Sequence, residues 1–190
     1  MGLRTSPGVC LDCIKQPPPI NTVLAALDYA YPWSGLISRY KFGEHPGWAP
    51  FFAAVLIKAP GVSDALQSTD LMLPVPLSKE RLQTRGFNQA WELTCALANQ
   101  SGRPTKTDST LLLRVKNTRP QTELLRQERL ANVKGAFQVD PLRVGAIKGK
   151  RVLLVDDVMT SGASLFTAAQ ALQAAGATHV AGLVLARTPF

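Results

Sequence analysis

Residues 152–164 read VLLVDDVMTSGAS, a hydrophobic segment followed by two adjacent aspartates and a small loop rich in hydroxyl groups. The segment Val152–Val155 is short, apolar and partly β-branched, which predicts a parallel strand covered on both faces. Residues 165–176 are rich in helix formers and end at Gly176, which suits the position just after a helix. We therefore expect residues 160–164 to connect the carboxyl end of a strand to the start of a helix.

A loop in that position has the features of an anion site. In α/β folds, free backbone N–H groups and the positive end of the helix dipole both point toward such a loop. Hydroxyl groups would add donors, and a glycine lets the backbone approach a ligand closely. The candidate residues for binding a phosphate are Thr160, Ser161, Gly162, Ala163 and Ser164.

Two acids beside an anion site require a partner other than phosphate. Ionised carboxylates only accept hydrogen bonds, so Asp156 and Asp157 suit the neighbouring hydroxyl groups of a ribose. The pattern thus predicts a sugar phosphate as ligand and the two aspartates as candidate catalytic residues. A surface turn after a strand is the alternative, and the specific order of strand, acids, loop and helix disfavours it.

The same stretch resembles the phosphoribosyl-pyrophosphate (PRPP) signature of type I phosphoribosyltransferases. Further segments are similar to the ComF/GntX family of competence-associated, phosphoribosyltransferase-like proteins, in one consistent order between Cys10 and Arg187. They are Tyr40-Lys41-Phe42-Gly43, Leu73-Pro74-Val75-Pro76-Leu77 and Arg85-Gly86-Phe87-Asn88-Gln89. Met159, Ser161 and Ser164 replace threonines that are more usual in the family. Met159 loses the hydroxyl, so we do not expect its side chain to contact phosphate.

The resemblance implies an α/β fold of the type I phosphoribosyltransferase kind, a parallel sheet flanked by helices with a small, mostly helical N-terminal hood. Strands that alternate with helices independently imply a parallel sheet. The expected division is a remnant of a zinc-ribbon-like N-terminus at 1–20, a helical hood segment at 21–70 and the α/β core at 71–190. In the family, the acids hold the ribose hydroxyls, the loop wraps the 5′-phosphate, and Mg²⁺ binds with PRPP.

A second anion site is predicted after residues 71–76, which read as a strand. Pro74 and Pro76 indicate the end of this strand rather than its centre. The next residues, through Arg85, form a basic loop, and a helix is expected to begin near Gly86. A strand end, a helix start and three cations together predict an anion site. The resemblance implies that this is the pyrophosphate loop, with the candidate residues Pro76, Leu77, Ser78, Lys79, Arg81 and Arg85.

The positive charge lies in the middle of the chain. Residues 79–151 contain fifteen Lys and Arg against six Asp and Glu, a balance of +9, whereas the remainder has six against seven, a balance of −1. Between strands expected at 111–113 and 135–139, a long basic segment is typical of a mobile lid. Its candidate binding residues are Arg114, Lys116 and Arg119. This charge suits pyrophosphate, a nucleotide or a nucleic-acid backbone, or else forms a solvated face.

Cys10 and Cys13 form a CxxC pair, which is half of a four-ligand zinc site. The family commonly has two such pairs; here either the chain is truncated at its start or the ribbon is degenerate, so zinc is not expected to bind to this chain alone. Residues 1–7 lack the apolar core of a signal peptide, and no apolar stretch reaches the roughly 18 residues of a membrane span. Three cysteines without a secretion signal favour the cytoplasm.

Residues 21–61 are predicted to be largely helical. Their aromatic and basic side chains, including Tyr29 and the segment Tyr40-Lys41-Phe42, can stack nucleobases. We interpret them instead as packing within the hood.

Three functions fit this sequence. The first is a PRPP-binding phosphoribosyltransferase that acts in DNA uptake, natural transformation or nucleotide salvage from DNA, with an unidentified acceptor. The second is a non-enzymatic accessory factor that binds single-stranded DNA and partners a helicase, with a vestigial PRPP site. The third is a structural module with a dead site. The intact Asp156-Asp157 pair and hydroxyl loop favour PRPP binding, while the charge excess is more than one pyrophosphate requires.

Overall fold

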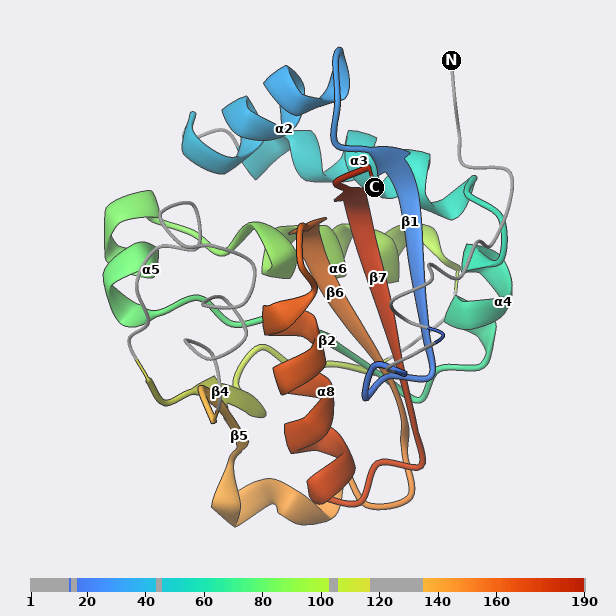
Figure 1. Cartoon of the computed structure of the whole chain (residues 1–190), viewed down its shortest axis with the longest axis vertical. Coiled ribbons are helices and arrows are strands. Elements are labelled where there is room, and N and C mark those ends of the chain that lie inside the picture. Colours follow the sequence, from blue (N-terminus) through green and yellow to red (C-terminus); the bar gives the residue numbers. More distant parts are fainter. Residues whose placement is uncertain (1–13, 15–16, 44–45, 103–105, 117–134, 190) are drawn as a thin grey trace.

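The computed structural model describes Ile14 and residues 17–43, 46–102, 106–116 and 135–189. Within these residues, a five-stranded parallel sheet has the order β1-β7-β6-β2-β3 (Figure 1). Its strands are β1 (Thr22–Asp28), β2 (Leu71–Pro74), β3 (Lys106–Thr107), β6 (Arg151–Met159) and β7 (His179–Arg187). The predicted α/β class with a parallel sheet is therefore confirmed.

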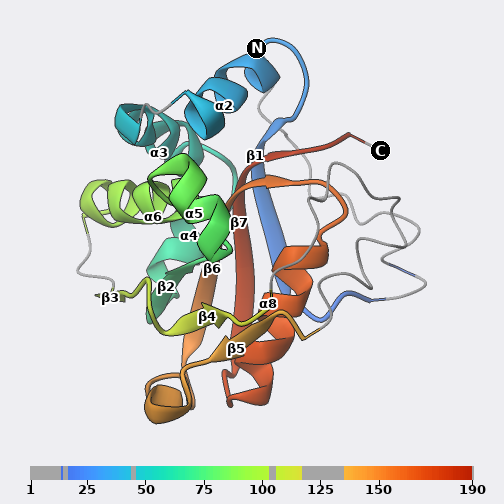
Figure 2. The same cartoon turned by 90° about the vertical axis from the view of Figure 1, so that its left-hand side faces the viewer.

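Helices cover both faces of the sheet, as Figure 2 shows. One face carries α2 (Trp33–Phe42), α3 (Ala49–Ile57), α4 (Val62–Gln67) and α6 (Gln89–Gln100). The other face carries α8 (Ala163–Ala174) and a ribbon of β4 (Leu112–Arg114) and β5 (Phe137–Val139). The remaining elements are α5 (Lys79–Arg85), η1 (Pro46–Trp48) and η3 (Pro141–Ala146). No helix in the described part of the chain is long and apolar enough to cross a membrane.

Strand β6 is apolar on both sides because both sides are covered. Val152 and Leu154 belong to the core cluster shared with α8, whereas Leu153 and Val155 belong to the cluster shared with α3 and α6. The neighbouring strands are parallel and in register, with Leu154 opposite Leu73 of β2. This arrangement is the reason for a continuous apolar run rather than an alternating one.

Helix α8 ends where its sequence predicts. The N–H of Gly176 donates to the carbonyl of Gln173 (2.9 Å), and the N–H of Ala177 donates to that of Leu172 (3.0 Å). Gly176 adopts φ +94°, a left-handed conformation that a glycine adopts without steric cost. These bonds form a Schellman motif, which satisfies carbonyls that the helix leaves without an internal partner.

The prediction of helix at residues 22–28 is wrong. These residues form β1, which pairs in parallel with β7 along its length, for example Leu24 with Leu183. Leucine and alanine favour helices locally, but pairing with a buried strand overrides that preference. The expected hood segment at 21–70 therefore contains one strand of the main sheet as well as α2, α3 and α4.

The strands expected at 111–113 and 135–139 do not join the parallel sheet. They form the antiparallel ribbon of β4 and β5, in which Leu112 lies opposite Val139. Both of these side chains are buried in the cluster that contains α8. The ribbon thus covers part of the α8 face and brings the end of β4 close to the carboxyl edge of the sheet.

Candidate functional site

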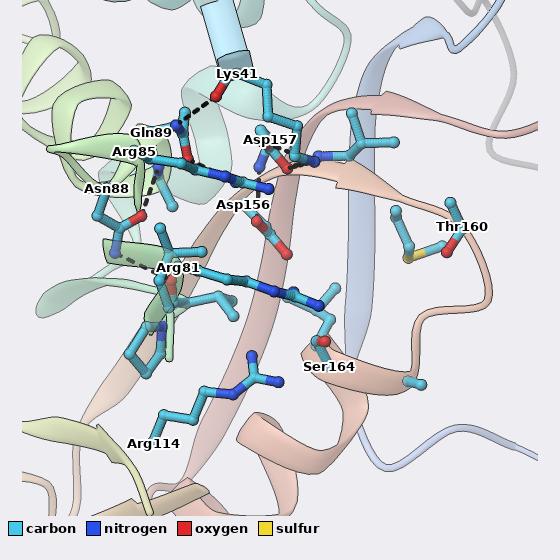
Figure 3. A pocket seen from close by; sticks show the side chains of 18 of the residues that line it. Lys41, Arg81, Arg85, Asn88, Gln89, Arg114, Asp156, Asp157, Thr160 and Ser164 are labelled. Carbon is cyan, nitrogen blue, oxygen red and sulfur yellow. Dashed lines mark hydrogen bonds and ion pairs between the residues drawn. The ribbon is translucent and has the colours of Figure 1, made fainter. Parts of the chain in front are cut away.

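A pocket of about 510 Å³ lies at the carboxyl ends of β2 and β6 (Figure 3). Its walls come from the loop before α8, from α5, from the start of α6, from the end of β4 and from the hood residues Tyr29, Lys41 and Phe42. Parallel sheets bind ligands at this edge, because the strands end there and helices begin. The pocket therefore joins the two anion sites predicted from separate stretches of sequence.

The predicted phosphate loop forms one wall of the pocket. Thr160, Gly162, Ala163 and Ser164 line it. Ser161 is turned toward the helix instead, where its Oγ accepts a hydrogen bond from the N–H of Ala163 (3.4 Å). Gly162 precedes α8 with φ +78°, and the first N–H groups of a helix have no acceptor within the helix. The loop can therefore offer backbone donors to an anion.

The aspartate pair lies within β6 rather than after it. Strand pairing continues through Asp156, opposite Val184, and on to Met159, opposite Arg187. The Asp157 N–H donates to Asp156 Oδ1 (2.8 Å), and the Val158 N–H donates to Asp157 Oδ1 (2.7 Å). Both aspartates line the pocket, and their place in a paired strand gives them fixed directions.

Asp156 retains its proton to an unusually high pH. Its removal from bulk water and the adjacent Asp157 carboxylate raise the pKa of Asp156 to about 7. The Lys41 ammonium opposes this rise because it favours the ionised form. Near neutral pH, this carboxyl can therefore both accept and donate a proton.

Lys41 forms an ion pair with Asp157, and sequence reasoning missed it. Its Nζ lies 3.0 Å from both carboxylate oxygens, although α2 and β6 are far apart along the chain. The interpretation of the segment Tyr40-Lys41-Phe42 as hood packing holds for the buried Tyr40, whose ring contacts Phe52. The available signal was the presence of Lys41 in one of the segments that resemble the ComF/GntX family.

The segment 85–89 joins the hood to the floor of the pocket. Gly86 ends α5 with φ +76°, and Asn88 caps α6 by accepting from the Ala90 N–H (3.0 Å). Gln89 is buried; its side chain donates to the Lys41 carbonyl (3.0 Å) and accepts from Arg85 Nη1 (3.1 Å). The Tyr40 hydroxyl donates to the Gln89 carbonyl (2.7 Å). These contacts fix the end of α2 over the pocket.

The predicted pyrophosphate loop is mostly the helix α5. Ser78 caps it by accepting from the Arg81 N–H (3.4 Å), and its side chain is buried, so this hydroxyl is used within the protein. The serine cap and the left-handed glycine stabilise the two ends of this short helix. Of the predicted residues, Pro76, Leu77, Arg81 and Arg85 line the pocket; Ser78 and Lys79 do not.

Arg114, one of the predicted lid residues, contributes to the pocket. It lies at the end of β4, lines the pocket and is directed toward it (Figure 3). Burial and the nearby Arg81 lower the pKa of Arg114 to about 10, so the guanidinium remains charged at neutral pH. Lys116 is exposed and does not line the pocket, and Arg119 lies outside the described residues. Three arginines, two from α5 and one from β4, thus converge on one cavity.

Cys10 and Cys13 also lie outside the described residues. Among the residues that are described, no three or more His, Cys, Asp or Glu side chains are grouped as metal ligands.

The fold and the site define a type I phosphoribosyltransferase-like protein: a parallel α/β sheet with an aspartate pair, a hydroxyl loop and a helix start at its carboxyl edge. Residues 109–189 match the phosphoribosyl transferase domain family. The chain is 34% identical over 184 residues to a DNA utilization protein, YhgH, of Salmonella typhimurium, covering 94% of this chain and 78% of that protein. It is 32% identical over 183 residues to competence protein F of Haemophilus influenzae, with the same coverage. The chain belongs to the ComF family, and the resemblance inferred from its motifs is confirmed.

The conformation of the loop predicts an effect of Gly162→Ala. A Cβ at this position would lie 2.6 Å from the Phe166 ring, and φ is +78°. The left-handed conformation alone costs an alanine roughly 1–2 kcal/mol. We expect the melting temperature to fall by at least about 3 °C. Gly35→Ala is the control, because Gly35 lies in α2 with nothing within 4 Å and should be neutral or stabilising. Equal melting temperatures for the two variants would contradict this interpretation of the loop.

The raised pKa of Asp156 predicts a pH-dependent loss of stability. Folded protein keeps this proton up to about pH 7, whereas an unfolded chain releases it near about 3.9. Between these values the folded state binds more protons, so this residue lowers the unfolding free energy as pH rises, and the loss levels off above 7. Urea unfolding from pH 5 to 8 should show the wild type losing stability relative to Asp156→Asn. The assignment would be contradicted if the unfolding free energy of the wild type minus that of Asp156→Asn stayed constant or rose between pH 5 and 8.

Proposed function

We propose that this protein binds PRPP and transfers its phosphoribosyl group to an acceptor. The observation that carries the proposal is the convergence of a phosphate loop, a carboxylate and three arginines on one pocket. PRPP has the matching sequence of groups: a 5′-phosphate, ribose hydroxyls and a pyrophosphate. The volume of the pocket, about 510 Å³, lies within the range usual for ligand sites.

Each group of PRPP has a matching partner in the pocket. Residues 160–164 would bind the 5′-phosphate through backbone N–H groups and the hydroxyls of Thr160 and Ser164. Asp156 would accept hydrogen bonds from the ribose hydroxyls. Arg81, Arg85 and Arg114 would bind the pyrophosphate, since guanidinium groups form paired hydrogen bonds with phosphate oxygens.

The chemistry needs charge stabilisation more than a strong nucleophile. As the bond between C1 of ribose and pyrophosphate breaks, positive charge develops on the sugar and negative charge on the leaving group. The arginines would stabilise the leaving pyrophosphate, and Asp156 would hold the ribose as the acceptor forms its bond to C1. Exclusion of water from the pocket would favour transfer over hydrolysis.

Mg²⁺ accompanies PRPP in this class of protein, where it screens the charge of the pyrophosphate. The described residues offer no cluster of three or more acidic, His or Cys ligands. Mg²⁺ commonly keeps several waters and binds through substrate phosphates. An Mg²⁺ ion that accompanies PRPP would then be held mainly by oxygens of the ligand and by water.

The names of the relatives support a role in the use of DNA. YhgH is a DNA utilization protein and competence protein F is a competence protein. We place the proposed transfer in nucleotide salvage that accompanies DNA uptake. The alternative, a single-stranded-DNA-binding factor without enzyme activity, is less well supported, because Arg81, Arg85 and Arg114 line the pocket.

Loss of the Asp156 charge should weaken PRPP binding. Asp156→Asn keeps the size of the side chain but removes charge-assisted hydrogen bonds, so affinity for PRPP with Mg²⁺ should fall at least about tenfold, or about 1.4 kcal/mol. Isothermal titration calorimetry at pH 8 measures it. Asp64→Asn is the matched control, because Asp64 is exposed in α4 and does not line the pocket. Unchanged affinity in Asp156→Asn would refute this role for Asp156.

The arginine wall makes a prediction that separates the two ends of the ligand. Arg114→Gln should weaken binding of PRPP and of inorganic pyrophosphate by about tenfold, since one charged donor is lost. Binding of ribose 5-phosphate, which lacks the pyrophosphate, should change little. Lys116→Gln, two residues away and exposed, is the control. Equal loss for all three ligands would place Arg114 outside the pyrophosphate site.

A further inference from the structure

The two carboxylates of the aspartate pair have different surroundings. Asp156 is partly exposed, whereas only 5% of the Asp157 surface is exposed. Figure 3 shows Asp157 beside the end of Lys41 and Asp156 directed into the pocket. The difference follows from the strand itself, because successive side chains of a β-strand point to opposite faces. Asp156 continues the face of Leu154, and Asp157 continues the face of Val155, toward the hood helices.

The Asp157 carboxylate is already engaged within the protein. Lys41 Nζ lies 3.0 Å from each of its oxygens, and Oδ1 also accepts the Val158 N–H at 2.7 Å. The Lys41 side chain is 23% exposed and that of Asp157 is 8% exposed, so water screens the pair only weakly. A ribose hydroxyl would have to compete with an ammonium group for this carboxylate.

Lys41 is itself held in place from the backbone. Its carbonyl accepts a hydrogen bond from the buried Gln89 side chain (3.0 Å), which in turn accepts one from Arg85 (3.1 Å). The neighbouring Tyr40 is fully buried and donates to the Gln89 carbonyl (2.7 Å). The ammonium group therefore reaches the floor of the pocket from a fixed point on the hood.

We propose that Lys41 is a positioning residue that locks Asp157, so that within the pair only Asp156 contacts the ribose hydroxyls. This inference rests on the proposed PRPP function and assigns unequal roles to two adjacent residues of the same type. Asp157 anchors the hood to β6, and Asp156 binds the ligand. The segment 85–89 acts on Asp157 indirectly, because it holds Lys41 in place.

The Lys41 charge also acts on Asp156. Charged side chains surround Asp156 from several elements: Asp157 on its own strand, Lys41 on α2, Arg85 and Arg81 on α5, and Arg114 on β4, with Glu80 also lining the pocket. Burial and Asp157 raise the pKa of Asp156, and Lys41 opposes both. Removal of the ammonium should therefore shift ionisation of Asp156 to higher pH.

The test compares Asp156→Asn, Asp157→Asn, Lys41→Met and the double variant Lys41→Met/Asp157→Asn. Melting temperature and calorimetric affinity for PRPP with Mg²⁺ are measured on each full-length chain. Either single change at the ion pair leaves a poorly compensated charge and should lower the melting temperature by about 5 °C. The double variant should recover most of that loss and bind PRPP within about threefold of wild type at pH 8, whereas Asp156→Asn loses at least about tenfold.

A pH series separates positioning from simple packing. The affinity of the wild type for PRPP should rise with pH as Asp156 ionises, and Lys41→Met should move the midpoint up by about 0.5 pH unit or more. Lys41→Arg keeps the charge and should restore the wild-type midpoint. An unchanged midpoint in Lys41→Met would overturn the positioning role.

Two other outcomes would overturn the inference in different ways. If Asp157→Asn and the double variant lose PRPP affinity as strongly as Asp156→Asn, Asp157 is a ligand-binding residue. If the decreases in melting temperature of the two single variants add up in the double variant, Lys41 and Asp157 are not coupled, and their ion pair does not anchor the hood to β6. Failure of the wild type to bind PRPP would instead refute the proposed function, and the melting temperatures would still decide whether the anchor exists.

Discussion

The register of β6 is the constraint on which the site depends. This strand is hydrogen-bonded on both sides, to β7 and to β2, and both of its faces are buried. A shift by one residue would bring the charged Arg151 or Asp156 into a fully buried position of the core, so the apolar run Val152–Val155 holds the register firmly. The same register sends Asp156 into the pocket and Asp157 toward Lys41. The positions of the two carboxylates are therefore consequences of packing that lies several residues away.

The pocket also depends on contacts between the segment 85–89 and the hood helix α2. The segment 85–89 ends one helix, begins the next and contacts the hood, and Gln89 does so while almost completely buried. A buried amide must satisfy its hydrogen bonds, and Gln89 satisfies them with the Lys41 carbonyl and the Arg85 guanidinium. Two of the three further segments that resemble the ComF/GntX family, 40–43 and 85–89, thus serve one purpose. They bring a cation of the hood to the floor of the site.

Three arginines give part of the pocket wall a positive charge that favours a polyanion. Arg81 lies close enough to Arg85 and Arg114 to lower the pKa of both, with burial as the larger cause. Bringing like charges together in a partly buried cavity is unfavourable, and the folded structure tolerates it because other contacts hold α5 and β4 in place. An anion with several oxygens would relieve this repulsion. Preorganisation of this kind is how a site favours a charged leaving group.

Local sequence alone determined the parts of the site that are contiguous. The order of apolar run, aspartates, glycine-containing loop and helix predicts β6, the loop after it and α8, because each feature reflects the conformational preference of a short segment. The caps of α5, Ser78 and Gly86, are local signals too, and they indicate a helix instead of a loop. Only the tertiary structure decided that residues 22–28 pair with β7, that Arg114 faces the pocket, and that Lys41 meets Asp157 across a separation of 116 residues. Their local sequences are compatible with other structures, and the free energy that selects one comes from pairing and burial with distant segments.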